Sequence, residues 1–493
     1  MTEEKNSGKW LALIAIILGA FVAVLNNSLI NVALPEMVNV FGSSTDVIQW
    51  VLTGYMLANA VVIPMSGFLG DRFGYKKVFV VSLAGFTIGS LLCGLAWSDS
   101  SLIGFRIIQG LAGGLISPLS MAIIYSIMPR HQIGTALGIW GIAAMAAPAI
   151  GPTASGYLIQ YLNWRFLFFI CVPIGAFAVL MGVLLLKETP KREGTTFDWQ
   201  GAVLSIIFFG SLLLALSKGN SEGWTSFFIV SLFFVSVFSM LLLIWVETGK
   251  QQPLLDLRFF KNPIFTLSVI CSSLVMMGLY GGTFLTPLYL QNVQVLTPIQ
   301  TGLVMMPQSV AMALMMPVSG KLFDKIGVVP LAFTGLILMG TTTFELHRLT
   351  IDTPNHWLDF VLTLRGLGIG LCMMPLTTVG MNAVPKEAVG RASSVSNVIR
   401  QVAGTMAIAI LTMLMMNRQV FHGNEISENI QIGSFQASQL LSQLTTGYYQ
   451  MGADLSTSSA GATYILFGWI QKEALSRSIA DTFMASSLPL FIC

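Results

Sequence analysis

The segment GFLGDRFGYKK at 67–77 combines glycines with charged residues in a pattern suited to a gate. Glycine permits a tight turn and close helix approach, and Asp71 can pair with nearby cations. A copy of the pattern, GKLFDKIGVV at 320–329, places Asp324 at the same point. The alternative is that the cations only fix the topology of the chain in a membrane. The repeated Gly-x-x-x-Asp spacing favours a gate. Its candidate residues are Gly67, Asp71, Arg72, Gly74, Lys77 and Asp324.

Arg106 lies one to two helical turns inside an apolar run, with Gln109 one turn further on. A charge at this depth in a membrane costs about 2–3 kcal/mol on insertion scales unless it finds water or a partner. One interpretation is that Arg106 snorkels to the outer interface. We favour the other, in which Arg106 and Gln109 form a polar face in a central cavity and take part in proton coupling.

The run AAMAAPAIGPTASGYL interrupts an apolar segment with prolines and glycines. Proline frees backbone carbonyls and kinks a helix, while glycine lets a neighbouring helix approach. Ordinary helix packing would explain either residue type alone. Together they predict a helix that moves against its partner. The residues concerned are Pro148, Gly151, Pro152 and Gly156.

Polar and flexible side chains in other apolar segments are candidates for a substrate cavity. Asn26 and Asn27 cannot face the same way on one helix, so at least one of them is expected to be structural. The C-terminal half is rich in methionine, whose flexible side chain suits a pocket that accepts many shapes. Packing between helices is the alternative for each residue. The cavity candidates are Asn26, Asn31, Tyr280, Gln308, Met373, Asn397 and Arg400.

The composition indicates that lipid, not water, surrounds most of these elements. The chain has 493 residues, of which 54% are hydrophobic and only 10% charged, whereas soluble domains carry about 25% charged residues. Apolar runs long enough to cross a bilayer recur along the chain, which predicts an all-α polytopic membrane protein with about fourteen spans. The expected spans are 10–33, 47–70, 77–97, 101–128, 133–159, 165–186, 199–217, 225–246, 263–289, 299–320, 327–346, 357–384, 391–416 and 479–493.

Charge placement predicts the orientation. With the N-terminus in the cytoplasm, most of the 25 Lys and Arg residues fall in cytoplasmic loops, as the positive-inside rule requires. We therefore expect a multi-pass protein of the inner membrane. The segment 417–478 then lies outside and should form short amphipathic helices. The last span, beginning near Ile479, is short and is either incomplete or truncated.

The gate motif is one anchor of an internal repeat. Asp71 and Asp324, Arg106 and Arg365, and Gly134 and Gly390 stand about 250–260 residues apart. This predicts two six-span halves, at 1–187 and 263–493, separated by a segment at 188–262 that contains two additional spans.

These motifs resemble those of the major facilitator superfamily, in particular its fourteen-span drug:proton antiporter branch of EmrB and QacA type. The resemblance rests on LNNSLINVALP, GFLGDRFGYKK, FRIIQGLAGG, PAIGPTASG, NWRFLFFICVPIG, PLLDLRFFKNPIF and MMPLTTVGMNAVP. It implies the major facilitator fold, with the substrate site between the two halves. The motif MMPLTTVGMNAVP, together with GRASSVSNVIRQVAG and the polar segment 417–478, looks closer to the EmrB type than to the QacA type.

The resemblance implies proton-driven export of diverse lipophilic, often cationic, compounds by alternating access. It also implies a periplasmic adaptor of EmrA type as a partner, besides the lipid bilayer. Two alternatives stay open, namely export of one endogenous metabolite, lipid or siderophore, and a non-transporting membrane sensor or scaffold. No nucleotide-binding, hydrolase or metal-site motif is present in the sequence, so no enzyme activity, cofactor, metal or nucleic-acid partner is predicted.

The sequence departs from the family pattern at one position of chemical consequence. The family usually has Asp in its first motif, where this chain has Asn26. An amide cannot carry a proton, so the coupling role of that Asp is absent at this position. The proton carrier therefore has to be sought elsewhere.

Overall fold

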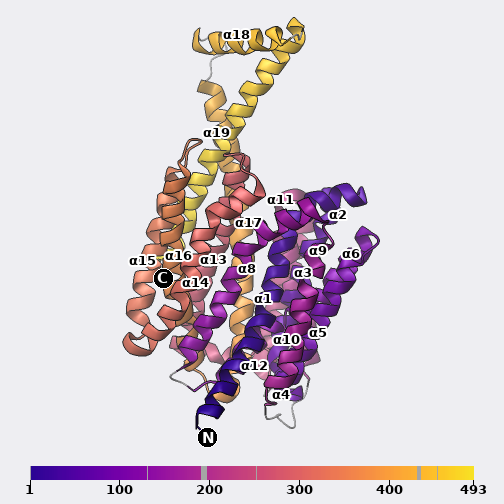
Figure 1. Ribbon diagram of the computed structural model, residues 1–493, viewed down its shortest axis with the longest axis vertical. Helices are drawn as coiled ribbons and strands as arrows, with labels where there is room; N and C mark the ends of the chain where they lie inside the picture. Colours follow the sequence, from indigo (N-terminus) through magenta and orange to yellow (C-terminus); the bar gives the residue numbers. More distant parts are fainter. Residues whose placement is uncertain are drawn as a thin grey trace.

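The computed structural model describes residues 2–129, 132–189, 197–250, 252–429, 435–451 and 454–492. These residues form a bundle of helices from which a helical arm projects (Figure 1). The N-terminus lies at the opposite end of the bundle from the arm, so the two ends are called here the N-terminal end and the arm end.

The first half of the chain contributes α1 (Thr2–Phe41), α2 (Thr45–Ile48), α3 (Trp50–Val62), η1 (Ile63–Met65), α4 (Ser66–Phe73), α5 (Tyr75–Gly94), α6 (Asp99–Gly113), α7 (Ile116–Ile127), α8 (Ile133–Tyr161), α9 (Phe166–Phe169), α10 (Cys171–Leu185), α11 (Trp199–Glu222) and α12 (Phe227–Gly249). The second half contributes η3 (Leu257–Lys261), α13 (Pro263–Asn292), α14 (Pro298–Ile326), α15 (Val328–Glu345), η4 (Leu346–Arg348), α16 (Asn355–Asn382), η5 (Lys386–Ala388), α17 (Val389–Asn429), α18 (Phe435–Gln450) and α19 (Leu455–Ile492).

The all-α fold expected from the sequence is confirmed. Within the described ranges, 12 helical stretches are long and apolar enough to cross a membrane. They coincide with twelve of the predicted spans. The two other predicted spans, near 133–159 and 479–493, fall on α8 and α19, which are helical but not among the 12. The count of fourteen therefore stays a prediction.

Local sequence signals set several helix starts. Thr297 accepts a hydrogen bond from the backbone N–H of Gln300, and the Gln300 side chain accepts one from the Thr297 N–H. This capping box satisfies two N–H groups that a helix terminus leaves unpaired, and Pro298 follows at the first helical position. At the start of α13, the Asn262 side chain accepts a hydrogen bond from the Ile264 N–H, and Pro263 takes the first helical position.

Two groups of helices pack against each other in the bundle. The most extensive contact joins α8 of the first group to α14 of the second. At the N-terminal end, α4 and α7 also pack against α17, whereas α3, which continues α4 towards the arm end, packs on α6 and α11. The additional helices α11 and α12 pack on each other, and α11 contacts both α3 and α17.

The arm corrects one sequence expectation and leaves another open. The last predicted span lies within a longer helix, since α19 is one helix of 38 residues from Leu455, and the start of that span near Ile479 stays a prediction. Segment 417–478 is not a set of short helices, because α17 extends as far as Asn429 and α19 begins at Leu455, so that α18, with 16 residues, is the one short helix among its described residues (Figure 1). Polar residues at these positions favour helix ends in a membrane protein, but a helix that leaves the bilayer can continue in water.

Candidate functional site

The gate motif at the end of α4 bonds to the opposite half of the bundle. Asp71 accepts a hydrogen bond from the Tyr75 hydroxyl at 2.7 Å, and its other oxygen lies 3.6 Å from the Nε of Arg391 on α17. One turn away, the hydroxyls of Ser66 and Ser394 are 2.6 Å apart, and both side chains are buried. These contacts hold the N-terminal end of the two halves together.

Glycines make this close approach possible. A methyl group on Gly67 would lie 3.0 Å from the α-carbon of Arg391, and one on Gly390 would overlap the Tyr75 hydroxyl. The second copy of the motif is arranged reciprocally, because Gly320 on α14 packs directly on Gly134 of α8. Each copy thus contacts the glycine that the internal repeat assigns to the other half.

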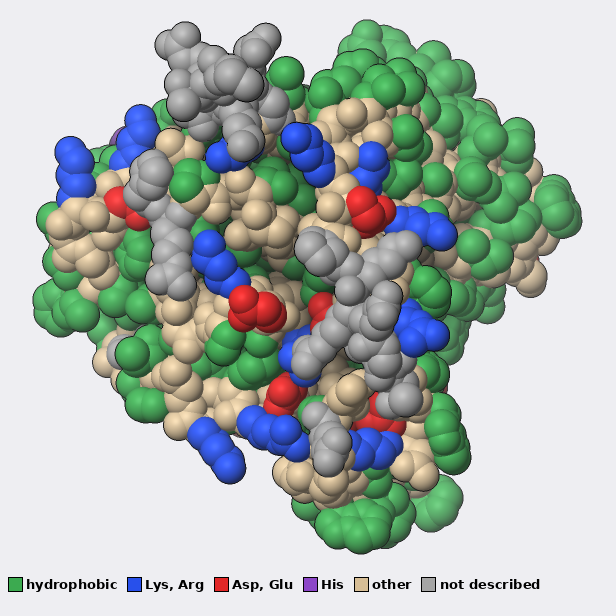
Figure 2. All heavy atoms as spheres, turned by 90° about the horizontal axis from the view of Figure 1, so that it is seen from below, with side chains coloured by type: hydrophobic (Ala, Val, Ile, Leu, Met, Phe, Trp, Pro, Cys, Tyr) green, Lys and Arg blue, Asp and Glu red, His purple; other side chains and the backbone are tan. Residues whose placement is uncertain are grey.

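The remaining motif residues lie at the same end of the bundle. Gly74 has a φ of 93°, a conformation that side chains rarely adopt. Arg72, Lys77 and Asp324 are exposed, and an Asp324 carboxylate oxygen lies 3.4 Å from the position a Gly134 methyl group would take. Viewed from this end, Lys and Arg side chains surround a smaller number of carboxylates (Figure 2).

Arg391 bridges two carboxylates. Its NH1 atom lies 3.6 Å from an oxygen of Asp256, in the linker after α12, while its Nε faces Asp71. Apolar contacts support this connection. Leu255 belongs to a buried cluster with Ile63 and Val395, and α11 and α12 contribute to the same cluster. The additional helices are therefore packed onto the contact between Asp71 and Arg391.

Arg106 is fully buried within the first half, so its guanidinium does not snorkel to the outer membrane interface. Its NH1 donates to the side-chain oxygens of Asn26 and Gln109, both at 2.8 Å, and its Nε donates to the Val51 carbonyl at 3.0 Å. The guanidinium also lies 4.0 Å from the centre of the Tyr55 ring, an attractive geometry for a cation. Its NH2 has no hydrogen-bond partner.

Arg365 occupies the equivalent place in the second half. It is fully buried, and it donates to the Thr343 hydroxyl at 3.0 Å and to the Gly278 carbonyl. Among the described residues, neither this arginine nor Arg106 forms an ion pair. Both halves thus hold a guanidinium on neutral acceptors of neighbouring helices. This arrangement stabilises the charge with dipoles alone.

The proline- and glycine-rich motif lies in α8, where it faces α1 and α14. A methyl group on Gly151 would overlap Ser28, and the Ser155 hydroxyl donates to the Leu29 carbonyl at 2.7 Å. A methyl group on Gly156 would lie 3.1 Å from Ile299 of α14. The side chains of Asn31, Pro148 and Pro152 lie outside the described part of the structure.

Four of the cavity candidates lie close together where α7 meets α16 and α17. Arg400 donates to Thr377 Oγ1 at 3.0 Å and to Asn397 Oδ1 at 3.1 Å, and Thr377 donates to the Met373 carbonyl at 3.0 Å. Tyr280, on α13, packs on α17 at Gly404. Gln308 is buried on α14 apart from this cluster, with its backbone against Gly366. Asn26 is buried in the first half, beside Arg106.

Three residues that contact the candidate sites, Met121, Tyr125 and Asp256, were not predicted as site residues from the sequence. Met121 of α7 lies 3.9 Å from an Arg400 nitrogen, and the Tyr125 hydroxyl donates to the Thr378 carbonyl at 3.4 Å. Met121 and Tyr125 belong to an apolar helix of ordinary composition, so no signal in the sequence marked them. Asp256 was visible only as part of the family-like segment PLLDLRFFKNPIF.

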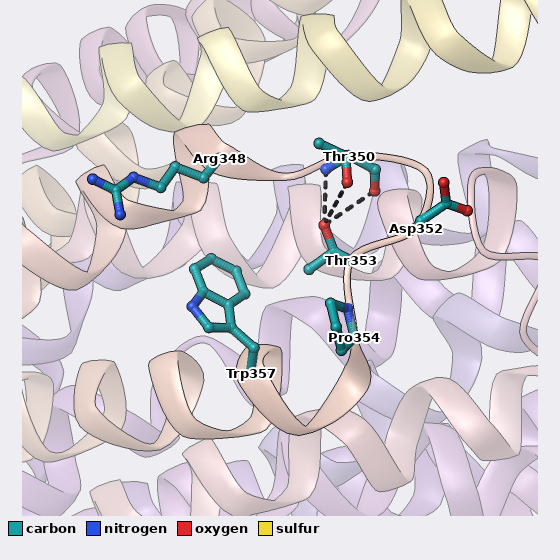
Figure 3. A pocket seen from close by; sticks show the side chains of 6 residues that line it. All are labelled: Arg348, Thr350, Asp352, Thr353, Pro354 and Trp357. Atoms are coloured by element: carbon teal, nitrogen blue, oxygen red, sulfur yellow. Dashed lines mark hydrogen bonds between the residues drawn. The ribbon is translucent and has the colours of Figure 1, made fainter.

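A small surface pocket of about 270 Å³ lies at the arm end, in the loop between η4 and α16. Thr353 closes the loop by accepting a hydrogen bond from the Thr350 N–H at 2.8 Å, and Trp357 forms one wall (Figure 3). All six residues of the pocket come from this one loop and its ends, so it does not lie between the two halves.

An all-helical membrane bundle whose two halves meet at repeated charged motifs defines a polytopic membrane transporter. The sequence of residues 16–408 matches the model of the Major Facilitator Superfamily, and the chain belongs to this family.

Named relatives agree with this assignment. The chain is 39% identical over 427 residues to the uncharacterized MFS-type transporter YhcA of Bacillus subtilis (strain 168), covering 86% of this chain and 80% of the relative. It is 33% identical over 473 residues to the multidrug export protein EmrB of Escherichia coli (strain K12), covering 94% and 89%. The crystal structure of the human organic anion transporter MFSD10 superposes with a TM-score of 0.63, covering 98% and 99% at 14% identity, which shows the common fold.

Proposed function

We propose that this transporter exports diverse lipophilic and amphipathic compounds, driven by the proton gradient, through alternating access between its halves. The observation that carries the proposal is the reciprocal gate, in which each half presents a Gly-x-x-x-Asp motif to a glycine of the other. The relationship to a multidrug export protein supports the substrate class. The charge distribution supports an inner-membrane location with the N-terminal end in the cytoplasm.

In this orientation the structure has its gate closed on the cytoplasmic side. The Ser66–Ser394 and Asp71–Arg391 contacts and the packing of Gly134 on Gly320 all lie at that end. Rocking of segment 1–187 against segment 263–493 would break them, and segment 188–262 would follow through its contacts with α3 and α17. Pro148, Gly151, Pro152 and Gly156 would permit α8 to move.

The proposal gives Arg106 and Gln109 a part in coupling and the Arg400 cluster a part in substrate binding. Asn26, which accepts a hydrogen bond from Arg106, is an amide, so the first-motif position itself cannot carry a proton. Arg400 and Asn397 contact Met121 of the first half, and a substrate would be bound at this contact between the halves during alternating access. Met373 lies one turn from Thr377, which accepts from Arg400. The arm is the proposed contact for an adaptor of EmrA type.

Ethidium efflux from energised cells, with and without a proton uncoupler, tests the proposal. We expect efflux by the wild type that the uncoupler abolishes, and loss of efflux in Arg106→Ala. Efflux that persists unchanged after the gradient is collapsed would contradict proton-driven export. Deleting the arm residues 435–451 tests the adaptor separately, because an adaptor-dependent protein should lose export by whole cells and keep transport in vesicles.

The buried guanidinium groups favour a second candidate, the export of an anionic amphiphile. Arg400 lies at the contact between the halves, and no described carboxylate is paired with it. A panel that includes an anionic dye beside ethidium separates the two candidates. Loss of anionic-dye efflux in Arg400→Gln, with ethidium efflux retained, would favour the second candidate.

A further inference from the structure

The buried carboxylates of the described side chains all lie at the N-terminal end. They are Asp71, Asp198, Glu247 and Asp256, and none is more than 9% exposed. Asp71 and Asp256 are the two that flank Arg391. Asp198 and Glu247 belong to the additional helices, at the start of α11 and the end of α12. Asp198 and Glu247 take no part in the ion pairs of Arg391.

Asp198 and Glu247 face each other across Gly201. A methyl group on Gly201 would overlap Glu247 Oε1 and would lie 2.8 Å from Asp198 Oδ2. These same two oxygens are buried and have no hydrogen-bond partner. The other Asp198 oxygen accepts from the Gly201 N–H and pairs with Lys250, whose carbonyl accepts from the Arg258 guanidinium.

Asp198, Glu247 and Lys250 together carry a net charge of −1 when both carboxyl groups are ionised, so one further proton would make the group neutral. Two carboxylates share one ammonium group, and burial of the remaining negative charge is costly. A single proton bound by Asp198 or Glu247 would remove that charge. Without it, two negative charges would repel each other across the Gly201 backbone.

A short path connects the carboxylate pair to the gate. Glu247 Oε2 accepts the backbone N–H of Leu255 at 3.4 Å, and the next residue, Asp256, pairs with Arg391. The Leu255 side chain is buried in the cluster that joins α11 and α12 to α17. A displacement of Glu247 would therefore move Leu255 and the adjacent Asp256, which pairs with Arg391 in the gate.

We propose that Asp198 and Glu247 form a proton-binding site that controls the gate. With one proton bound, the pair holds Leu255 in place and Asp256 stays on Arg391. Loss of the proton to the adjoining solution separates the two carboxylates, draws Asp256 away and frees Arg391 and Asp71 to part. The additional helices thereby act as a pH sensor on the side that we assign to the cytoplasm. The inference rests on the proposed alternating access, because it requires a gate that opens.

Labelling of a cysteine in the gate tests the proposal. Ser394→Cys, in a background without the native cysteines, places a thiol at a position that is buried while the gate is closed. The rate at which purified protein reacts with a polar maleimide is measured from about pH 6 to about pH 8. Each rate is divided by the thiolate fraction of the cysteine at that pH, so that the corrected rate reports how exposed the thiol is. We expect labelling to accelerate as pH rises, by up to about tenfold per unit for one coupled proton.

Glu247→Gln supplies the decisive comparison, because glutamine resembles the protonated acid. It should give slow labelling that no longer varies with pH, and Asp198→Asn should also remove the pH dependence. Glu222→Gln, at the exposed opposite end of α11, is the matched control and should behave as the reporter alone. Gly201→Ala changes no charge but occupies the space between the carboxylates, so it should accelerate labelling at low pH.

Two outcomes would overturn the proposal. One is a labelling rate that is independent of pH in the reporter itself, and the other is an unchanged pH dependence in Glu247→Gln. The experiment uses neither substrate nor proton gradient, so it remains informative if export proves not to be proton-driven. Conversely, uncoupler-sensitive efflux in Glu247→Gln cells would leave the proposed function standing even if the pH sensor failed.

Discussion

Replacing Asn26 by aspartate should stabilise the protein, although it buries a new charge. Asn26 Oδ1 accepts a hydrogen bond from Arg106 NH1 at 2.8 Å, and both side chains are fully buried. The amide nitrogen contributes little, because its nearest acceptors, Ser90 Oγ and Cys171 Sγ, are 3.5 and 3.6 Å away. A carboxylate at this position would keep the acceptor, give it a negative charge and offer a second oxygen to the Arg106 NH2 that now has no partner.

The magnitude follows from three opposing contributions. Two charges at about 4 Å attract by about 4 kcal/mol at the effective dielectric constant of a protein. A charge-assisted hydrogen bond is about twice as strong as the neutral one it replaces, while desolvation of the new carboxylate costs several kcal/mol. The guanidinium is already buried, so its own desolvation is not added. The net gain should be about 1–2 kcal/mol, or about 1–2 °C in apparent Tm for a chain of this length.

Thermal unfolding of the purified protein in detergent, followed by intrinsic fluorescence, measures this effect. Asn27→Asp is the matched control, because Asn27 is half-buried and its Oδ1 has no hydrogen-bond partner. An added charge there should lower the apparent Tm. If Asn26→Asp lowered the apparent Tm as much as Asn27→Asp does, the view of Arg106 as a buried cation lacking a counter-charge would be refuted.

Two further substitutions test other parts of the structure. Gly320→Ala should prevent closure of the N-terminal end, since the methyl group overlaps Gly134, and we expect export to fall by more than about tenfold; Gly210→Ala, where nothing lies within 4 Å, should export normally. Asp481→Asn should loosen the base of the arm, because one Asp481 oxygen bonds to both Arg418 at 2.6 Å and His422 at 2.8 Å. These groups are partly exposed, so the loss should be about 1 kcal/mol or less, seen as faster hydrogen exchange in α17 and α19 with export unchanged.

The helical bundle could be predicted because bilayer thickness imposes a simple rule on the sequence. Each apolar run must be about 20 residues long, and the described helices lie where such runs occur. The internal repeat likewise paired Gly134 with Gly390 without any structural information. The repeat does not show that Gly134 lies across the interface from the motif of Asp324, or Gly390 across from the motif of Asp71. These positions depend on how the two halves face each other.

The polar contacts could not be predicted to the same degree. Glu247 and Asp198 end and begin two apolar runs, where charged residues are normally taken as flanks of a span. Their burial results from the packing of residues 252–256 over α11 and α12, which hydropathy does not report. Arg106 and Gln109 could be placed on one polar face from their spacing, but the other acceptors of Arg106, Asn26 and the Val51 carbonyl, lie on α1 and α3. Contacts between distant segments leave no local pattern.

Because α19 is one continuous helix, a rotation at its base in the bundle displaces its tip in the arm. A helix of 38 residues is about 57 Å long, and it runs without a break from the bundle to the far end of the arm (Figure 1). A rigid rod of this length moves at its tip by roughly 1 Å for each degree of rotation at its base. Small tilts of the second half during a transport cycle would therefore become displacements of many ångströms at α18, so a molecule bound there would be carried back and forth with each cycle.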